Sequence, residues 1–196
     1  ADEYDSAFFD KRSKFVHYKP QTLVVNNLEF DHADIFADLN AIQTQFHHLV
    51  RCIPSSGHII ASKSDAIDEV LNRGCWTPVS RLDTGSPDDW SVQARDKHFG
   101  EFEISSPAGD RGAITWVLIG RHNAENALAA VAAAHDIGVS VKDACEALCR
   151  FEGVKRRLEL LGAPNEIAIY DDFAHHPTAV KTTLEGLRSA AGEQRV

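Results

Sequence analysis

The sequence lacks methionine altogether, and cysteine is sparse. Its four cysteines include no C-x-x-C pair, the spacing that is typical of zinc and redox sites. Cys145 and Cys149 are four residues apart in a helical pattern, and we interpret them as small core residues in preference to a metal or disulfide pair. Because a chain of 196 residues does not need disulfides to hold its core together, a reducing cytoplasm is the expected location.

No run of apolar residues approaches the roughly 18 that a membrane-spanning helix needs, and no signal peptide is recognisable. A basic excess is also lacking, because 29 acidic side chains outnumber 20 basic ones and the net charge is −9. Proteins that bind nucleic acids usually show the opposite balance. The sequence therefore predicts neither a nucleic-acid nor a membrane partner, although an acidic protein can still bind small phosphates locally.

The motifs that cradle nucleotide phosphates are missing as well. Neither G-x-x-x-x-G-K-[ST] nor G-x-G-x-x-G occurs, and the hydrolase motifs G-x-S-x-G and H-E-x-x-H are absent too. The chain starts within a polar motif at Ala1, and it stops at Val196, where a strand would begin after a helical stretch and Gly192. We therefore expect a segment cut from a longer protein.

The pattern of apolar residues predicts an α/β fold with a mostly parallel sheet flanked by helices. Thr22–Val25 is a short β-branched run suited to a buried parallel strand, and a second strand is expected at 57–61. Helices are expected at 34–51, from apolar residues at 3.6-residue spacing, and at 65–72, closed by a glycine. Between 76 and 120, short alternating runs separated by Gly, Pro and Asp predict a small antiparallel β unit.

The C-terminal half of the pattern is helical before it returns to α/β. An Ala-rich helix is expected at 123–137, and a second helix, capped by a serine, at 140–151. A strand at 166–170 and a helix at 177–191 with proline in its first turn predict a new βα unit. We place a domain boundary near Glu152–Gly153, before a basic run that is a plausible hinge.

The first polar cluster with candidate chemistry follows the first predicted strand. It comprises Asn26, Asn27, Glu29, Asp31 and His32. The carboxyl ends of parallel strands are where α/β proteins place chemistry, and oxygen ligands with an occasional imidazole suit Mg²⁺. A polar turn that caps the next helix explains the same residues equally well, so spacing alone leaves both interpretations open.

Two further clusters have the character of nucleotide contacts. Asn123 and Asn126 are three residues apart at a predicted helix start and share a face, and paired amides can read the edge of a purine. N-capping by Asn123 alone is the simpler alternative. Downstream, Lys155-Arg156-Arg157 offers guanidinium groups suited to phosphate, although a solvated basic stretch would look the same.

The fourth cluster lies between the last predicted strand and helix. Asp171, Asp172, His175 and His176 stand within six residues of one another. Two carboxylates and two imidazoles are costly to hold at one strand-to-helix turn unless they are used. They could bind a metal or a phosphate, or transfer protons. Turn and cap chemistry is the alternative.

In their order along the chain, these clusters resemble the Mur ligases of bacterial cell-wall synthesis, and the resemblance spans the whole sequence. The loop Asn26–His32 is similar to the family's N-x-E-x-D-H loop, whose histidine binds magnesium, which implies that His32 is a metal ligand. His122–Asn126 is similar to the H-N-x-x-N element that contacts adenine. That likeness implies nucleotide binding by this histidine and by Asn123 and Asn126.

The basic run and the acidic turn match the family as well. In Arg156-Arg157-Leu158-Glu159 the phosphate-contacting arginine falls on Arg157, and the aspartate that holds the nucleotide falls on Asp172. His175 and His176 match the D-D-[YF]-[GA]-H-H-P signature of the branch that recognises muramate. The resemblance thus implies catalytic roles for all four residues. It also implies that residues 1–152 form a central ATP-binding domain and 153–196 begin a Rossmann-like C-terminal ligase domain.

Within the family, Glu3–Phe15 and Asn27–Phe36 are most similar to the murein-recycling branch. That branch joins UDP-N-acetylmuramate to the tripeptide L-alanyl-γ-D-glutamyl-meso-diaminopimelate, and the branch that adds L-alanine alone is the alternative. In the implied reaction, ATP phosphorylates the muramoyl carboxylate, and the amino group of the peptide then displaces phosphate from the acyl phosphate. ATP and Mg²⁺ are the implied cofactors.

Some features depart from the family pattern. The phosphate loop, and a magnesium-binding glutamate that should precede Ala1, lie outside the chain, so Glu3 is a candidate stand-in for that metal ligand. Several relatives carry a modified lysine in the predicted helix at 34–51, and this chain has none there. The muramate-recognising branch commonly lacks that lysine. The alternatives from other classes are a non-catalytic nucleotide-binding module and a metal-dependent hydrolase. The hydrolase would use Asp172 and the two histidines after it. These motifs do not encode an oligomeric state.

Overall fold

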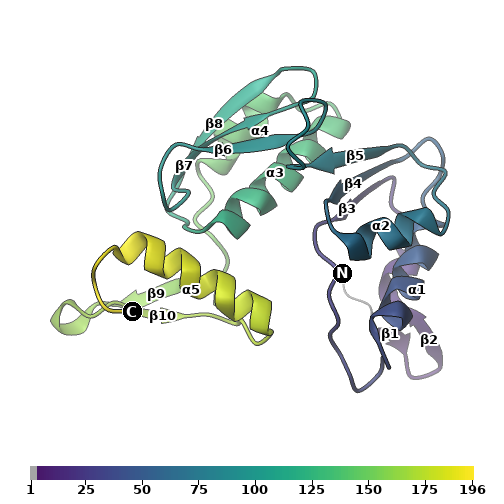
Figure 1. Cartoon of the computed structure of the whole chain (residues 1–196), viewed down its shortest axis with the longest axis horizontal. Coiled ribbons are helices and arrows are strands. Elements are labelled where there is room, and N and C mark those ends of the chain that lie inside the picture. The colour runs from purple at the N-terminus through teal and green to yellow at the C-terminus, as the bar shows by residue number, and fades with distance from the viewer. Residues whose placement is uncertain (1–3) are drawn as a thin grey trace. The chain divides into compact units, whose positions relative to one another are not determined.

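The computed structural model describes residues 4–196. Their internal contacts divide them into two compact units (Figure 1). The first unit runs to Ser91 and includes Ala132–Gly138, and the second unit comprises Val92–Val131 and Val139–Val196. Within the described part of the chain, no helix has the length and apolar character needed to span a membrane.

The first unit is built on a parallel sheet in the order β3-β4-β5, as the α/β prediction requires. The strands are β3 (Thr22–Val25), β4 (His58–Ser62) and β5 (Val79–Leu82). The central strand is the most deeply buried, and Ile59, Ile60 and Ala61 are at most 1% exposed. A strand that is covered on both faces favours such a continuous apolar run.

Helices α1 (Leu39–Val50) and α2 (Asp65–Asn72) pack into the same core. Asp38 caps α1 by accepting a hydrogen bond from the Ala41 amide at 2.8 Å, and Ser64 caps α2 in the same way. Each cap satisfies a backbone N–H that the helix itself leaves unpaired, which contributes about 1 kcal/mol. The sheet is preceded by the hairpin of β1 (Asp5–Ala7) and β2 (Asp10–Ser13) and by a 3-10 turn at Lys14–His17.

Two predictions for this unit were wrong. The helix expected at 34–51 begins only at Leu39, because the preceding residues form a turn in which the amides of Ile35 and Phe36 donate to the carbonyl of His32. The segment Val79–Leu82, expected to belong to the antiparallel unit, pairs parallel with β4. Its mixed sequence suits a half-exposed edge strand and lacks the apolar run that predicts a buried parallel one.

A cluster of polar side chains closes the amino end of this sheet. His58 lies between two partners, with Nδ1 2.7 Å from Asp136 Oδ1 and Nε2 2.9 Å from Ser80 Oγ. Thr22 Oγ1 donates to the other oxygen of Asp136. Partial burial acts to raise the pKa of Asp136, but the hydrogen bonds from Thr22 and His58 outweigh it, and the pKa lies below its usual value. The last residue of α3 (Arg121–Asp136) is thereby tied to the starts of three strands.

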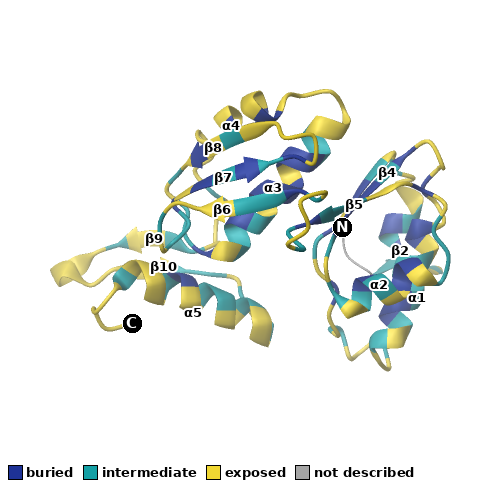
Figure 2. Cartoon of the chain, turned by 45° about the horizontal axis from the view of Figure 1, so that its top comes forward, coloured by how far each residue is buried: buried dark blue, intermediate teal, exposed yellow. Residues whose placement is uncertain are grey.

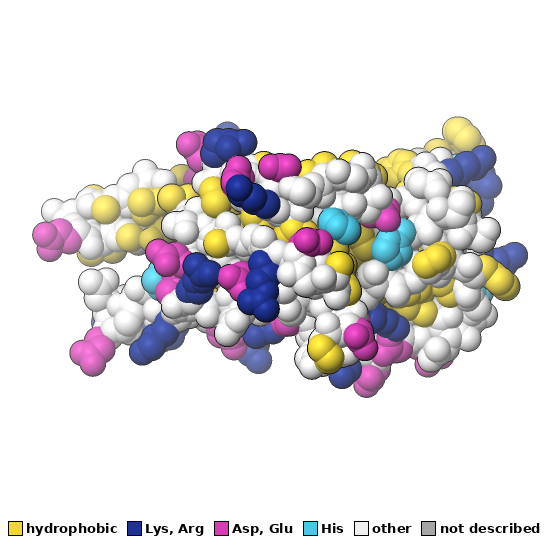
Figure 3. Space-filling model, turned by 90° about the horizontal axis from the view of Figure 1, so that it is seen from above, with side chains coloured by type: hydrophobic (Ala, Val, Ile, Leu, Met, Phe, Trp, Pro, Cys, Tyr) yellow, Lys and Arg dark blue, Asp and Glu magenta, His cyan; other side chains and the backbone are white. Residues whose placement is uncertain are grey.

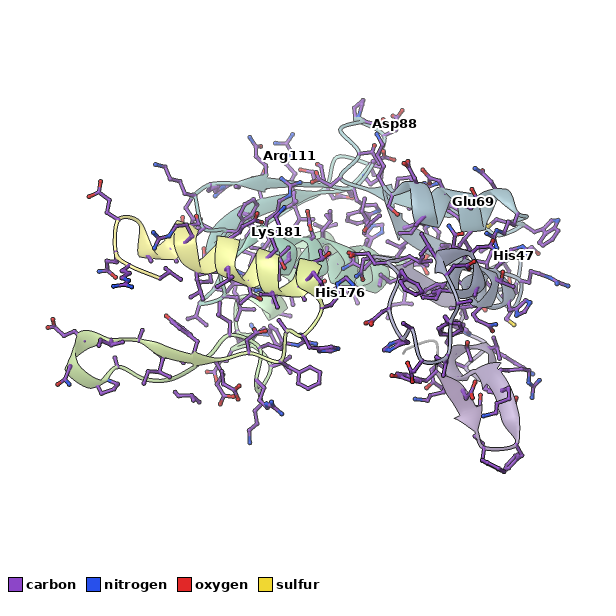
Figure 4. All side chains as sticks on the ribbon, turned by 60° about the horizontal axis from the view of Figure 1, so that its bottom comes forward. His47, Glu69, Asp88, Arg111, His176 and Lys181 are labelled. Carbon is purple, nitrogen blue, oxygen red and sulfur yellow. The ribbon has the colours of Figure 1, made fainter. Side chains whose placement is uncertain are left out.

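Replacing Asp136 with asparagine tests this cluster. Because its folded-state pKa is lowered, the carboxylate stabilises the fold above the usual value of 3.8, and this is lost as the pH falls through the folded-state pKa. We expect Asp136→Asn to reduce the free energy of unfolding in urea at pH 7 by roughly 1 kcal/mol, the usual net value of one intramolecular hydrogen bond. The deficit should shrink below pH 3.8. Asp88→Asn, in an exposed loop, is the control (Figure 4). Equal stability of Asp136→Asn and the parent at pH 7 would contradict the analysis.

The second unit contains the predicted small antiparallel sheet, in the order β6-β7-β8. Its strands are β6 (Ser91–Ala94), β7 (Glu101–Ser105) and β8 (Arg111–Thr115). Phe102, Ile104 and Ile114 have no exposed surface. Helix α4 (Val141–Leu148) packs on this sheet so closely that a Cβ at Gly112 would come within 2.6 Å of the Cys145 Sγ. A glycine is therefore needed at that strand position.

Of the two cysteines predicted to share a buried face, only one lies in the core. Cys145 is buried, and its burial, together with the nearby Cys149, raises the pKa of the Cys145 thiol to about 11. Cys149 is exposed, because α4 ends at Leu148 and Cys149 is its C-cap. The helical spacing that predicted a shared buried face therefore does not apply to Cys149.

The chain ends in a hairpin and a helix. Strands β9 (Glu159–Gly162) and β10 (Ile169–Asp171) pair antiparallel, and α5 (Pro177–Ala191) has the predicted bounds. The strand expected at 166–170 starts later, because Pro164–Glu166 form a 3-10 turn, and β9 was not predicted because its short Glu-Leu-Leu-Gly sequence does not alternate. Figure 2 shows how little of this hairpin is buried, in contrast to β7.

Candidate functional site

Asp172 organises the turn between β10 and α5. Its Oδ2 accepts a hydrogen bond from the Leu158 amide at 2.7 Å, and its Oδ1 accepts one from the Ala174 amide at 2.7 Å. Hydrogen bonds to an ionised acceptor are roughly twice as strong as neutral ones. Asp172 therefore joins the turn before α5 to the basic segment before β9, and the direction of its carboxylate is fixed by the main chain.

The basic segment has a strained backbone. Arg156 and Leu158 have φ values of +59° and +51°, in the left-handed region that non-glycine residues rarely adopt. Each such residue costs of order 1–3 kcal/mol and persists only where its surroundings impose it. Here the amides of both residues are held by carboxylates, since Arg156 N donates to Glu159 Oε2 at 2.8 Å and Leu158 N to Asp172.

This backbone brings the two arginines to an aromatic ring. The guanidinium carbons of Arg156 and Arg157 lie 5.3 and 5.7 Å from the centre of the Phe173 ring. The Phe173 amide also donates to the Arg156 carbonyl at 2.9 Å. Both arginines are exposed, and Arg156 pairs with Asp171 at 3.3 Å. Since guanidinium groups bind phosphate through paired hydrogen bonds, Arg157 is the better placed of the two for a phosphate.

The candidate adenine element lies in the first turn of α3. This helix begins at Arg121, so Asn123 stands inside it and is not its N-cap. The Asn123 side-chain amide donates to the Ile119 carbonyl at 2.8 Å, which fixes the amide and leaves its oxygen and its second N–H for other partners. Asn126, one turn later, is exposed. Such a pair of amides fits the donor–acceptor edge of a purine.

His122 connects this turn with the acidic and basic residues. Burial lowers the pKa of His122 below 6.5, while the charges of Glu125 and Asp172 act to raise the pKa and that of Arg157 acts to lower it. His122 therefore lies within electrostatic reach of both Asp172 and Arg157. Three of the predicted site residues, His122, Arg157 and Asp172, are thus brought together in the second unit, although they are up to fifty residues apart in sequence.

The two histidines of the turn have local roles. His175 Nδ1 lies 3.0 Å from the Phe173 carbonyl, and its ring meets the Phe173 ring edge-on at 5.1 Å. His176 is the N-cap of α5 (Figure 4), and its Nδ1 accepts a hydrogen bond from the Thr178 amide at 3.4 Å. Turn and cap chemistry therefore accounts for the position of His176. Between Tyr4 and Val196, no three His, Cys, Asp or Glu side chains form a group suited to a metal, so the hydrolase alternative gains no support.

The candidate metal loop lies in the first unit, after β3. His32 adopts a φ of +55°, and its amide donates to Asp31 Oδ1 at 2.7 Å. The His32 ring lies 4.2 Å from the Tyr4 ring and its Nδ1 lies 3.9 Å from Asp31 Oδ1. An imidazole and a carboxylate fit a share of a magnesium shell, and the remaining oxygen ligands would have to come from elsewhere. Glu3, the other predicted ligand, lies outside the described residues.

Sequence reasoning missed the aromatic partners of these residues. Phe173 lies beside two arginines and Tyr4 beside His32, and neither had been assigned a role. In the family signature D-D-[YF]-[GA]-H-H-P the third position is always aromatic, which was the available signal for Phe173. An aromatic face attracts a guanidinium group through its quadrupole. This attraction explains why an aromatic residue stands at that position, beside two arginines.

Comparison with known proteins places these residues in a family. A model of the Mur ligase middle domain matches residues 3–134, and a model of the Mur ligase glutamate ligase domain matches residues 156–196. This chain belongs to the Mur ligase family. The two matches leave 135–155 unassigned, and the boundary near Glu152–Gly153 stays a prediction.

Individual relatives give the same picture. The chain is 50% identical over 193 residues to the UDP-N-acetylmuramate–L-alanyl-γ-D-glutamyl-meso-2,6-diaminoheptandioate ligase of Haemophilus influenzae, covering 98% of this chain and 42% of that protein. It is 34% identical over 201 residues to the UDP-N-acetylmuramate–L-alanine ligase of an Arthrobacter species, covering 100% and 41%. The crystal structure of a murein peptide ligase from Psychrobacter arcticus aligns with a TM-score of 0.77 at 50% identity, covering 100% and 40%. This chain thus spans less than half the length of each of these relatives.

The electrostatic grouping around His122 predicts how its titration responds to substitution. Because the Asp172 charge raises the pKa of His122, Asp172→Asn should lower that pKa further, and Arg157→Gln should raise it. The pKa can be followed by NMR through the C2 proton of His122. Asp110→Asn, an exposed aspartate of the same unit, is the control and should leave the titration unchanged. Identical titration curves for Asp172→Asn and the parent chain would show that the two residues are not neighbours.

Proposed function

We propose that the full-length protein containing this chain is an ATP-dependent ligase that joins UDP-N-acetylmuramate to the tripeptide L-alanyl-γ-D-glutamyl-meso-diaminopimelate. Identity supports the tripeptide over L-alanine alone, since the chain is 50% identical to a tripeptide ligase and 34% identical to an L-alanine ligase over nearly the same span. Such an enzyme serves peptidoglycan recycling in the cytoplasm. The face shown in Figure 3 carries interspersed acidic and basic side chains and no broad basic area of the kind nucleic acids need.

The observation that carries this proposal is the grouping of His122, Arg157 and Asp172 in one compact unit. Asn123 and Asn126, which follow His122 in the first turns of α3, present amide groups for adenine. Arg157 is the cation for a phosphate of ATP, and its position depends on Asp172 through the Leu158 amide. Nucleotide recognition and charge compensation therefore meet at the start of α3.

The proposed reaction has two steps, activation of the muramoyl carboxylate by ATP and attack by the peptide's amino group. The γ-phosphoryl group passes to the muramoyl carboxylate, the peptide's amino nitrogen attacks the carbonyl carbon, and inorganic phosphate leaves as the amide forms. Negative charge builds up on phosphoryl oxygens, and a guanidinium placed beforehand stabilises it without reorganisation. A magnesium ion held in part by His32 would add charge compensation for the phosphates. His32 is fixed for this role by its turn and by the Tyr4 ring.

The proposal is tested by assaying the full-length protein with ATP, Mg²⁺, UDP-N-acetylmuramate and either the tripeptide or L-alanine. We expect amide formation with the tripeptide and release of one phosphate per product. Product with L-alanine alone would favour the other muramate-recognising branch. No product with either amine would favour a non-catalytic nucleotide-binding module.

Substitution of the proposed site residues should abolish this activity. We expect Asp172→Ala and His32→Ala each to lower kcat/KM by about 10²–10³-fold, the range found when one preorganised electrostatic group is removed. Asp110→Ala and His48→Ala, both exposed and outside the proposed site, are the matched controls. Normal turnover in either site variant would remove that residue from the site.

The 196-residue chain by itself should show no turnover and little affinity for ATP. Its sequence contains no glycine-rich phosphate loop, and such loops supply the backbone N–H groups that hold nucleotide phosphates. Isothermal titration calorimetry of the chain with ATP and Mg²⁺ measures this directly. Micromolar binding would show that the residues present here suffice.

A further inference from the structure

Helix α5 carries a glycine near its middle, and this glycine is the buried residue of the helix. Glycine is unfavourable in a helix interior compared with alanine, because it loses more backbone freedom on folding. The position of Gly186 therefore points to a close contact that a side chain would prevent.

The contact is with a second glycine. A Cβ built on Gly186 would lie 3.3 Å from the Gly120 Cα and 3.6 Å from the Gly120 nitrogen. Gly120 itself has a φ of +92°, in a region that side-chain-bearing residues rarely adopt. Two backbones thus meet without an intervening side chain at the turn from which α3 starts.

A hydrogen bond extends this contact along the same face of α5. Ser189, three residues after Gly186 and therefore on the same side of the helix, donates from its Oγ to the Lys97 carbonyl at 2.6 Å. The Gly120 amide in turn donates to the His98 carbonyl at 2.8 Å. The helix therefore rests on two loop segments that are joined to each other.

Gly120 is also in close contact with the candidate site. A Cβ on Gly120 would lie 2.7 Å from the His122 Cε1. Gly120 is thus enclosed between α5 and a residue of the nucleotide-binding turn. Asp172 precedes α5 by only a few residues and is tied to the Arg157 segment, so a shift of α5 moves both relative to α3.

We propose that Gly186 and Gly120 are positioning residues: their contact seats α5 against the start of α3 and so sets the distance between the Asp172–Arg157 structure and the adenine-binding amides. This inference rests on the proposed function for its catalytic consequence. The contact between Gly186 and Gly120 involves only residues of this chain, so it can be measured without ATP.

The test compares Gly186→Val and Gly186→Ala with Gly162→Ala in the full-length protein. Gly162 is a matched control, because it has an ordinary φ and no atom within 4 Å of a built Cβ. We expect Gly186→Val to raise KM for ATP by about tenfold or more, since small misplacements of binding groups have large kinetic effects. Gly186→Ala should show a smaller rise, because its neighbour must yield only slightly, and Gly162→Ala should show none. A variant that had merely lost stability would lower the amount of active enzyme and leave KM unchanged.

Hydrogen exchange of the 196-residue chain provides the second measurement. Gly186→Val should accelerate amide exchange around Gly120 and Ser189, whereas Gly162→Ala should not. If Gly186→Val does not fold, Ser189→Ala takes its place and should move both measurements in the same direction. Parent-like exchange and parent-like KM in the folded variant would overturn the proposal. A parent protein that forms no amide would instead overturn the proposed function, and the exchange result would still decide the contact.

Discussion

The two backbone amides that donate to the Asp172 carboxylate hold together the part of the chain on which the proposed chemistry depends. One comes from Leu158 in the basic segment and the other from Ala174 in the next turn. Because one side chain spans both, the left-handed backbone beside Arg157 is maintained against its cost. Both oxygens of Asp172 accept hydrogen bonds from backbone amides, so its observed role is structural, and the effect on a nucleotide that we propose for it would work through the groups it orients.

Other residues of the same turn also have structural roles. His176 caps α5, and Phe173 lies beside the guanidinium groups of Arg156 and Arg157. A sequence signature of this kind therefore contains residues that shape the turn itself. For His176 the structure supports the cap interpretation, whereas ligand binding by Asp171, Asp172 and His175 stays a prediction.

The elements that could be predicted from the sequence are those specified locally. Helix α5 was predicted with its observed bounds because His176 and Pro177 define its start and Gly192 its end. Candidate site residues could be proposed from the sequence because each stands in a short motif. The edge strand Val79–Leu82 was misassigned, because its partner strand decides its direction and its own sequence does not. The contact between Gly120 and Gly186 was not foreseen, because sixty-six residues separate two glycines that resemble any others.

On the proposed function, the charges present suit this chain to orient a nucleotide more than to attract one. ATP carries several negative charges, and Arg156 and Arg157 are exposed cations, each of which in water is worth little by itself. His122 adds little to them, because burial disfavours its charged form and lowers its pKa. Asn123 and Asn126 are uncharged and discriminate by hydrogen-bond pattern. The proposal therefore assigns most of the free energy of phosphate binding to backbone amides and magnesium, and it assigns recognition of the base and direction of the phosphates to the start of α3 and the Asp172 turn.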